Sequence, residues 1–229
     1  MKLIRYGITL NRLTQNDLEL LRKWRNSEKI RQNMIFRDEI TPDMQLNWFE
    51  SINNYNNFFY IIEFKSEKIG LIDNKGTDWQ AGSTHSGLFI YEEKYINSQI
   101  PVAASLILMQ IGYHILNIQV TKIKVLTSNK LAISYNKQLG FVESKNEQIN
   151  NFVEMVQTRE SFNSKTLVLH KALLKLNPET NPNLILHLEP PDYEIGVAQG
   201  VEKEIQKMNP FIIVKDFKNM DTRILEFNV

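Results

Sequence analysis

The sequence contains no cysteine, and this absence excludes several kinds of chemistry at once. Disulfide bonds, thiolate nucleophiles, iron–sulfur clusters and cysteine-based zinc sites all need a residue that the chain does not have. An excess of charge is also lacking, because 27 Lys and Arg stand against 26 Asp and Glu, for a net charge of +1. No overall field therefore draws the protein to nucleic acid or to an anionic membrane.

Long apolar runs are missing as well. The longest, Ile100–Leu116, is interrupted by Ser105, Gln110 and His114, and it falls short of the roughly 20 residues that span a bilayer. The first seven residues lack the apolar stretch of a signal peptide. We therefore expect a cytoplasmic protein with no membrane partner and no nucleic-acid partner.

The material for a folded core is present, since 42% of the residues are hydrophobic. Apolar periodicity and capping residues predict helices and strands in alternation. The expected strands are 3–10, 58–64, 68–72, 87–91, 122–127, 151–157 and 165–170; the expected helices are 15–26, 42–52, 102–116 and 131–138. This order predicts an α/β (α+β) protein with a mixed sheet and helices interspersed.

The composition changes after Lys175. Five of the seven prolines and an excess of nine acidic over five basic residues fall in the last stretch. The pattern there is strand 184–188, helix 193–208, strand 211–215 and strand 222–227. We expect a main domain over 1–175 and a small β-α-β-β extension over 176–229, which is short for an independent core and so docks on the main domain or on a second subunit of a homodimer.

One segment, 129–141, is more specific than any periodicity. Its sequence NKLAISYNKQLGF resembles the N-x-x-A-I-x-x-Y-x-x-x-G-F stretch of the GNAT N-acetyltransferase superfamily. The tripeptide at 24–26, WRN, and the helix expected from Thr41 resemble the branch that holds ribosomal-protein alanine and nucleotide-amino-sugar acetyltransferases. The strand at 84–90 stands where these proteins carry an A-E-I-G-I-Y-I-like strand. The resemblance covers about residues 3–170.

The resemblance implies a GNAT-like fold, with a mixed, mostly antiparallel sheet flanked by helices, and acetyl-CoA as co-substrate. It implies that Tyr135 is the general acid at the thioester sulfur, and that Asn129 binds the pantetheine arm of CoA. Tyr135 is equally placed to pack on the sheet, and Asn129 to cap the helix that follows it. The backbone of Phe89, Ile90 and Tyr91 would pair with the pantetheine amides.

The turn that would bind the CoA pyrophosphate departs from the family pattern [RQ]-x-x-G-x-[GA]. The resemblance assigns it to Gln99, Val102, Ala103 and Ala104. Val102 stands where the pattern has its first glycine, and Pro101 has no N–H to donate. A plain loop that caps a core helix is the alternative.

His85 stands where many relatives have Glu, and a neutral imidazole is a suitable base for an ammonium substrate. Glu92 and Glu93 are substitutes. The acceptor pocket is assigned by resemblance to Trp24, Arg25 and Asn26, although packing suits Trp24 and structural hydrogen bonds suit the other two.

We expect an acetyl-CoA-dependent N-acetyltransferase that acts on the primary amine of a small molecule, with an amino sugar favoured over a protein N-terminus. A GNAT-like scaffold that has lost turnover and serves binding or assembly is the alternative from another class. A zinc site is not expected, because neither His114 nor His170 has a second ligand at metal spacing.

Overall fold

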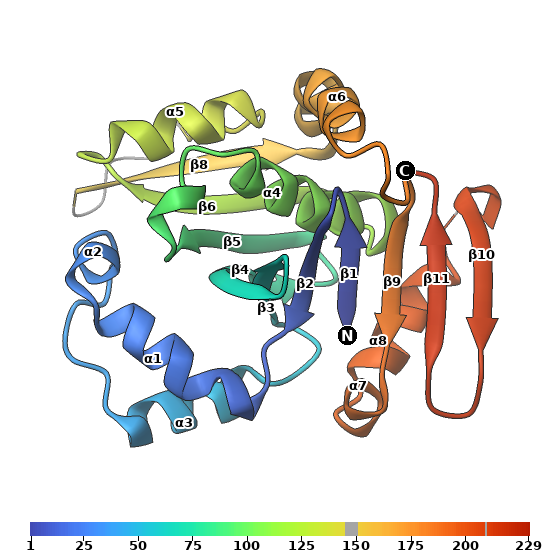
Figure 1. The fold of residues 1–229 in the computed structure, drawn as a ribbon, viewed down its shortest axis with the longest axis horizontal. Coiled ribbons are helices and arrows are strands. Elements are labelled where there is room, and N and C mark those ends of the chain that lie inside the picture. The colour runs from blue at the N-terminus through green and yellow to red at the C-terminus, as the bar shows by residue number, and fades with distance from the viewer. Residues whose placement is uncertain (145–150, 209) are drawn as a thin grey trace.

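The computed structural model describes residues 1–144, 151–208 and 210–229. The described strands form one sheet of eleven, in the order β10-β11-β9-β1-β2-β3-β4-β5-β6-β8-β7 (Figure 1). All neighbours among them are antiparallel except β5 and β6. The strands are β1 Lys2–Arg5, β2 Ile8–Arg12, β3 Phe58–Phe64, β4 Glu67–Asp78, β5 Ser83–Ile90, β6 Val120–Leu126, β7 Val142–Glu143, β8 Phe152–Thr158, β9 Leu184–Leu188, β10 Ile213–Lys218 and β11 Arg223–Phe227.

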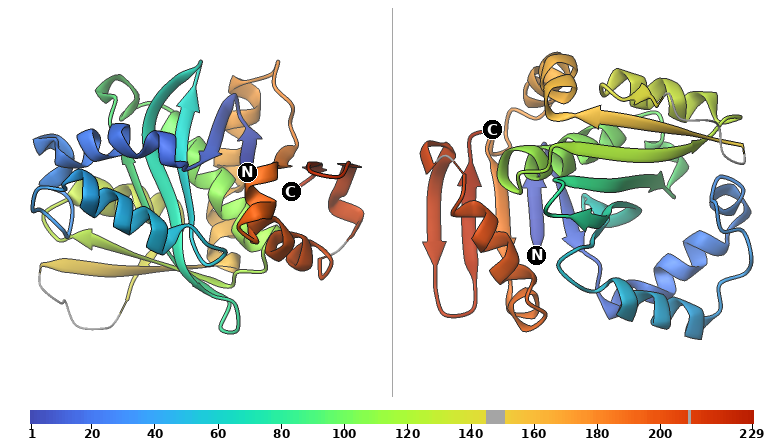
Figure 2. Two further views of the ribbon diagram at one scale, coloured as in Figure 1. Left: turned by 90° about the horizontal axis from the view of Figure 1, so that it is seen from below. Right: turned by 180° about the vertical axis from the view of Figure 1, so that it is seen from behind.

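Helices cover both faces of this sheet, as the mixed α/β architecture predicted from the sequence requires. They are α1 Leu18–Asn26, α2 Glu28–Arg31, α3 Pro42–Ile52, α4 Ile100–Gln110, α5 Lys130–Gln138, α6 Arg159–Leu176, α7 Pro190–Glu194 and α8 Val197–Ile205. Helices α1 and α3 pack on one face through a small cluster that includes Leu21, Trp24 and Phe49. Helices α4, α5, α6 and α8 contribute to the larger cluster on the other face, and Figure 2 shows α8 on the same side as α4.

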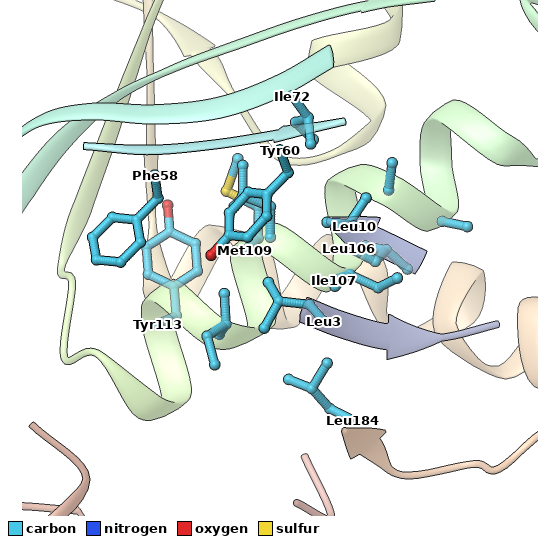
Figure 3. Packing of buried hydrophobic residues seen from close by; sticks show 14 of the residues in the cluster. Leu3, Leu10, Phe58, Tyr60, Ile72, Leu106, Ile107, Met109, Tyr113 and Leu184 are labelled. Atoms are coloured by element: carbon cyan, nitrogen blue, oxygen red, sulfur yellow. The ribbon is translucent and has the colours of Figure 1, made fainter. Parts of the chain in front are cut away.

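The centre of the larger cluster is α4, which buries ten of its eleven residues. It carries almost no polar side chain and continues as a π-helical stretch over Ile111–Ile115. Figure 3 shows Leu106, Ile107 and Met109 of α4 among residues of β1, β3 and β9. No helix in the described part of the chain is long and apolar enough to cross a lipid bilayer.

Three sequence-based elements differ from the structure. The strand expected over 3–10 is a hairpin, because Tyr6 and Gly7 both take positive φ (53° and 76°) in a two-residue turn between β1 and β2. The strand expected over 165–170 is wrong, since it lies inside α6, which Thr158 caps by accepting a hydrogen bond from the Ser161 amide. The helix expected over 193–208 is two helices, divided at Gly196 with φ 76°.

The segment after α6 extends the same sheet. Strand β9 inserts between β1 and β11, and the side chains of Val197, Val201 and Phe227 are fully buried. The ammonium of Met1 pairs with the buried carboxylate of Asp192 at α7. The extension therefore shares its core and its hydrogen-bonded edge with the first strand of the chain.

Candidate active site at the opening between β5 and β6

The parallel pair β5–β6 is joined over a short distance only. Ser83, Thr84 and His85 stand opposite Val120, Thr121 and Lys122, after which the strands diverge. On its other edge β5 remains paired with β4 as far as Ile90. Among the residues that the structure describes, the second half of β5 therefore has a strand partner on one side only.

The backbone groups at this open edge follow from the hydrogen-bond ladder. The amide of Tyr91 donates to the carbonyl of Ile69 at 2.7 Å, and the carbonyl of Phe89 lies so close to β4 that a Cβ on Gly70 would come within 2.3 Å of it. Because alternate residues of a strand point their N–H and C=O to opposite edges, Leu88 and Ile90 direct these groups toward the opening. Of the three residues assigned to the pantetheine arm, Ile90 thus has backbone groups on the open edge, whereas Phe89 and Tyr91 face β4.

Helix α4 begins beside this opening, and its first turn offers few free donors. The amide of Ile100 donates to Ser98 Oγ at 3.1 Å and that of Ala103 to the carbonyl of Gln99 at 2.9 Å. Pro101 has no N–H, and the side chain of Gln99 does not cap the helix. Within the described ranges, the amides of Gln99 and Val102 are the N–H groups at this helix start that have no protein partner. Ala104 is fully buried in the core.

Tyr135 reaches from α5 to this same turn. Its hydroxyl donates to the carbonyl of Pro101 at 2.9 Å and lies 2.8 Å from Ser105 Oγ. Burial raises the pKa of the Tyr135 phenol, so the group is protonated at neutral pH. Asn129 caps α5, because its Oδ1 accepts a hydrogen bond from the Ala132 amide at 3.0 Å.

His85 lies on the opposite face of the sheet from Tyr135. It stands directly between Lys75 of β4 and Lys122 of β6, and directly paired residues point to the same face. Burial, together with Lys122, Lys124 and Lys75, lowers the His85 pKa against the opposing effect of Glu154. The imidazole is therefore neutral at pH 7.

A buried carboxylate that the sequence analysis missed lies one step along the same face. Asp73 of β4 is 6% exposed and stands opposite Gly87 of β5. A Cβ at position 87 would come within 2.9 Å of Asp73 Oδ2, so the glycine makes room for the carboxylate. Lys75 Nζ lies 3.3 Å from Oδ1, at ion-pair distance, yet Oδ1 accepts no hydrogen bond of acceptable geometry.

Burial raises the pKa of Asp73, while Lys75 and Arg25 act in the opposite direction. Arg25 of α1 faces this carboxylate without touching it, and its Nε is buried without a hydrogen-bond partner. The signal in the sequence was Asp73, an acidic residue that directly follows the apolar residues of the segment GLID. A second signal was Gly87, which stands opposite to it in the neighbouring strand. It could be read only once the register of β4 and β5 was known.

The other two residues assigned to the acceptor pocket make structural contacts. Trp24 is 3% exposed and stacks on Tyr91 with ring centroids 5.4 Å apart. Asn26 holds the segment before α3, since its amide group bonds both the N–H and the C=O of Ile40, at 2.9 and 2.8 Å. Glu93 pairs with Lys29 at 3.5 Å. No group of three or more His, Asp and Glu in the described residues is arranged to hold a metal ion.

Solved structures share this architecture. The spermidine N-acetyltransferase of Vibrio cholerae, solved with CoA and spermine, matches with a TM-score of 0.59 and 17% identity over 69% of this chain and 99% of that one. AAC(6')-Ib, solved with ribostamycin and coenzyme A, matches with a TM-score of 0.59 and 19% identity over 69% and 96%. A domain from Methanocaldococcus jannaschii DSM 2661 matches with a TM-score of 0.56 and 21% identity over 66% and 97%. The chain has the GNAT fold. No family model and no curated protein matches it.

The motif at 129–141 can be compared residue by residue with the GNAT pattern given above. In the pattern N-x-x-A-I-x-x-Y the tyrosine stands seven positions after the asparagine, and in this chain that position is Asn136. Tyr135 stands one position earlier, where its side chain packs against α4. Asn136 donates to its own helix, at the carbonyl of Ala132, over 2.8 Å. The alignment of Tyr135 with the GNAT acid, made from the sequence, is therefore off by one residue.

The opening between β5 and β6 thus separates two chemically different sides. The side of α4 and α5 offers strand-edge backbone groups and, among the described residues, two amides without a protein partner at the start of α4. The opposite side offers a buried carboxylate, a neutral imidazole and several cations. A thioester held along β5 would meet an amine that arrives from the side of Asp73 and His85.

Proposed function

We propose that this protein is an acetyl-CoA-dependent N-acetyltransferase that acts on the primary amine of a small molecule. The observation that carries the proposal is the open edge of β5 with the buried Asp73 carboxylate directly behind it, in the next strand. The GNAT fold supports it, because the V. cholerae enzyme with this fold is solved with CoA and spermine, and AAC(6')-Ib with coenzyme A.

The backbone of Leu88 and Ile90 would hold the amides of the pantetheine arm by strand-like hydrogen bonds. The Val102 amide would donate to a phosphate at the positive end of α4. Lys94 precedes this end of α4, but its Nζ forms an ion pair with Glu67 at 2.8 Å. Its charge is therefore not available to a phosphate there. We therefore expect acetyl-CoA to be held mainly through its arm.

In the reaction, the amine nitrogen attacks the thioester carbon, a C–N bond forms and the C–S bond breaks. The substrate ammonium must first lose a proton, and Asp73 is placed to receive it. Burial raises the pKa of this carboxyl, so it holds a proton more readily than an exposed acid. His85 would pass the proton to solvent, since its imidazole is neutral. It lies on the same face as Asp73, two residues along β5 from Gly87, which stands opposite Asp73.

Tyr135 acts as a positioning residue in this scheme. Its proton is engaged by the Pro101 carbonyl, and it thereby fixes the first turn of α4 against α5. We expect Tyr135→Phe to raise the KM for acetyl-CoA while kcat and its pH profile stay close to those of the unaltered protein. A large fall in kcat with an unchanged KM would instead make the phenol the acid that protonates the thiolate.

The deciding test is a calorimetric titration of the purified protein with acetyl-CoA, with CoA as comparison, followed by a screen of amines for CoA release. Asp73→Asn should retain acetyl-CoA binding and lose about 100-fold or more in kcat, as expected for removal of a general base. Asp78→Asn, at the exposed end of the same strand, is the matched control and should be silent. Equal activity of the Asp73 variant would contradict the assignment.

A second candidate is a GNAT scaffold that binds or assembles without turnover. The specific observation in its favour is the first turn of α4, where Pro101 has no N–H and, among the described residues, the amides of Gln99 and Val102 alone have no protein partner. Absence of acetyl-CoA binding at millimolar ligand would select this candidate. Binding in the micromolar range, with a matching rise in melting temperature, would select the enzyme.

A further inference from the structure

The face of the sheet around Asp73 carries more positive than negative charge. Strand register places Lys75, His85 and Lys122 side by side on one rung. Two residues further along β6 from Lys122, Lys124 stands opposite Glu154 of β8. Directly paired residues share a face, and residues two apart in a strand do too. These side chains, with Asp73, therefore surround the acceptor side of the opening.

Two buried groups on this face lack hydrogen-bond partners, and they have opposite charges. Asp73 Oδ1 and Arg25 Nε are both buried and accept or donate no hydrogen bond, respectively. Within the described residues no ion pair of 4.0 Å or less joins Arg25 to Asp73. Asp73 Oδ1 has Lys75 Nζ at 3.3 Å as an ion-pair partner, but a buried polar atom that makes no hydrogen bond is still costly, and Arg25 Nε has no such neighbour in the described ion pairs. A ligand that carries both an ammonium and an anion would satisfy both.

We propose that the acceptor is an amine that also carries an anionic group, a carboxylate or a phosphate. This inference rests on the proposed acetyltransferase function. The ammonium lies against Asp73, and the anionic group lies among Arg25, Lys122 and Lys124. The acetylated nitrogen loses its charge in the reaction while the anion keeps its contacts, so the cations serve to bind and orient the acceptor rather than to activate it.

The same charges disfavour a polycation. A polyamine that placed one nitrogen at Asp73 would bring its other ammonium groups toward Lys75, Lys122 and Lys124, and such juxtaposition of like charges is a common means of rejecting a partner. The spermine-bound V. cholerae structure shares the fold of this chain, but the charges listed above predict a different acceptor for this protein.

The test compares acceptors matched in their amine and different in charge. Glucosamine 6-phosphate is set against glucosamine, glutamate against glutamine, and spermidine represents the polycations. We expect kcat/KM for the anionic member of at least one pair to exceed that of its neutral partner about tenfold, with spermidine the poorest. The two pairs show whether the anion is a phosphate or a carboxylate. A preference for spermidine, or equal rates within both pairs, would overturn the proposal.

Variants that remove a positive charge test which side chains bind the anionic group of the acceptor. Lys122→Gln combined with Lys124→Gln should reduce the preference within the pair to about threefold or less and weaken its dependence on salt, while the KM for acetyl-CoA stays the same. Lys203→Gln, exposed on α8 at the other end of the sheet, is the control. An unchanged preference in the double variant would place the anion elsewhere and contradict the proposal.

Failure of the two proposals can be told apart. If no amine is acetylated, the acetyltransferase proposal fails, and calorimetric titration of the same acceptors into the protein alone still measures the charge preference. Binding of the anionic member that is lost in the double variant would support the inference on its own. Binding of neither member, or equal binding of both, would overturn it.

Discussion

Two junctions in this sheet, β1–β9 and β5–β6, are each made by three paired residues from separate parts of the chain. At the first, Lys2, Leu3 and Ile4 of β1 pair with β9. At the second, Ser83, Thr84 and His85 of β5 pair with β6. The first junction uses most of β1, whereas the second uses less than half of β5 and leaves the rest of that edge open.

The two junctions also differ in what lies beneath them. The β1–β9 junction is sealed by fully buried aliphatic side chains, among them Leu3 and Leu186. Beneath β6 in the second junction the contact is polar, since the Tyr113 hydroxyl lies 2.9 Å from both Thr121 Oγ1 of β6 and Gln157 Oε1 of β8, all buried. Apolar packing thus closes the first junction, whereas at the second a buried polar network fixes β6 at Thr121, one of the three residues that pair with β5.

The largest effect is expected at the closed junction. Leu186→Ala should lower the free energy of unfolding by about 3 kcal/mol, because it opens a cavity beneath a strand pair with no solvent access. The measurement is a urea unfolding midpoint with unchanged slope. Leu176→Ala, 62% exposed at the end of α6, should stay within about 0.5 kcal/mol. A loss below 1 kcal/mol at Leu186 would mean that the extension adds little to the core.

At the β5–β6 junction we expect a smaller loss of stability, together with a loss of acetyl-CoA affinity. Tyr113→Phe should lower the free energy of unfolding by about 2 kcal/mol, because the buried side chains of Thr121 and Gln157 lose a hydrogen-bond partner. It should also weaken acetyl-CoA binding, since the point from which β5 and β6 diverge is no longer fixed. Tyr95→Phe, which removes a hydrogen bond to Glu67 near the surface, is the control for both readouts. Unchanged affinity in the Tyr113 variant would show that the opening does not depend on this network.

The smallest expected effect is a dependence of the folding stability on pH, which comes from His170 near the β1–β9 junction. Arg5 donates to the Pro182 carbonyl and to Gln110, and the Tyr6 hydroxyl shares a hydrogen bond with Nδ1 of His170. Burial, with Arg5 and Lys171, lowers the pKa of His170 to about 4. Since the unfolded chain binds this proton near pH 6.5, stability is full above that pH and declines as pH falls toward 4.

Because His170 is half-buried, we expect a decline of about 1 kcal/mol, well below the full linkage value. The measurement is the urea midpoint at pH 7.0, 5.5 and 4.5. His170→Gln should reduce the dependence in this range more than His187→Gln on β9 does, because burial lowers the pKa of His187 as well but the larger shift is that of His170. A decline that persists in the His170 variant would assign it to other groups.

The sequence predicted the elements whose signals are local. Thr41 and Pro42 begin α3 as expected, with Thr41 Oγ1 accepting from the Met44 amide at 3.2 Å, and the apolar run after Gln99 is the buried helix α4. The errors came where a nonlocal constraint decides. The β1–β2 turn places Tyr6 in a left-handed conformation that its side chain does not signal, and α6 overrides the apolar run at 165–170 because Thr158 caps it.

The site was harder to predict than the fold for the same reason. Residues were assigned to it by position in a motif, and several, such as Trp24 and Asn26, make structural contacts. Asp73 was not singled out, because its meaning depends on the glycine opposite to it in another strand and on Arg25 from α1. Such a group becomes visible only when register and burial are known.

The position of β9 beside β1 also sets the order in which the protein can fold during its synthesis. Leu3 pairs with Leu186, more than 180 residues later. At translation rates of about 5–20 residues per second, the first strand emerges on the order of ten seconds or more before its partner exists. During that time β1 is an apolar strand with an unpaired edge, which is the kind of segment that chaperones bind and that aggregates when left uncovered.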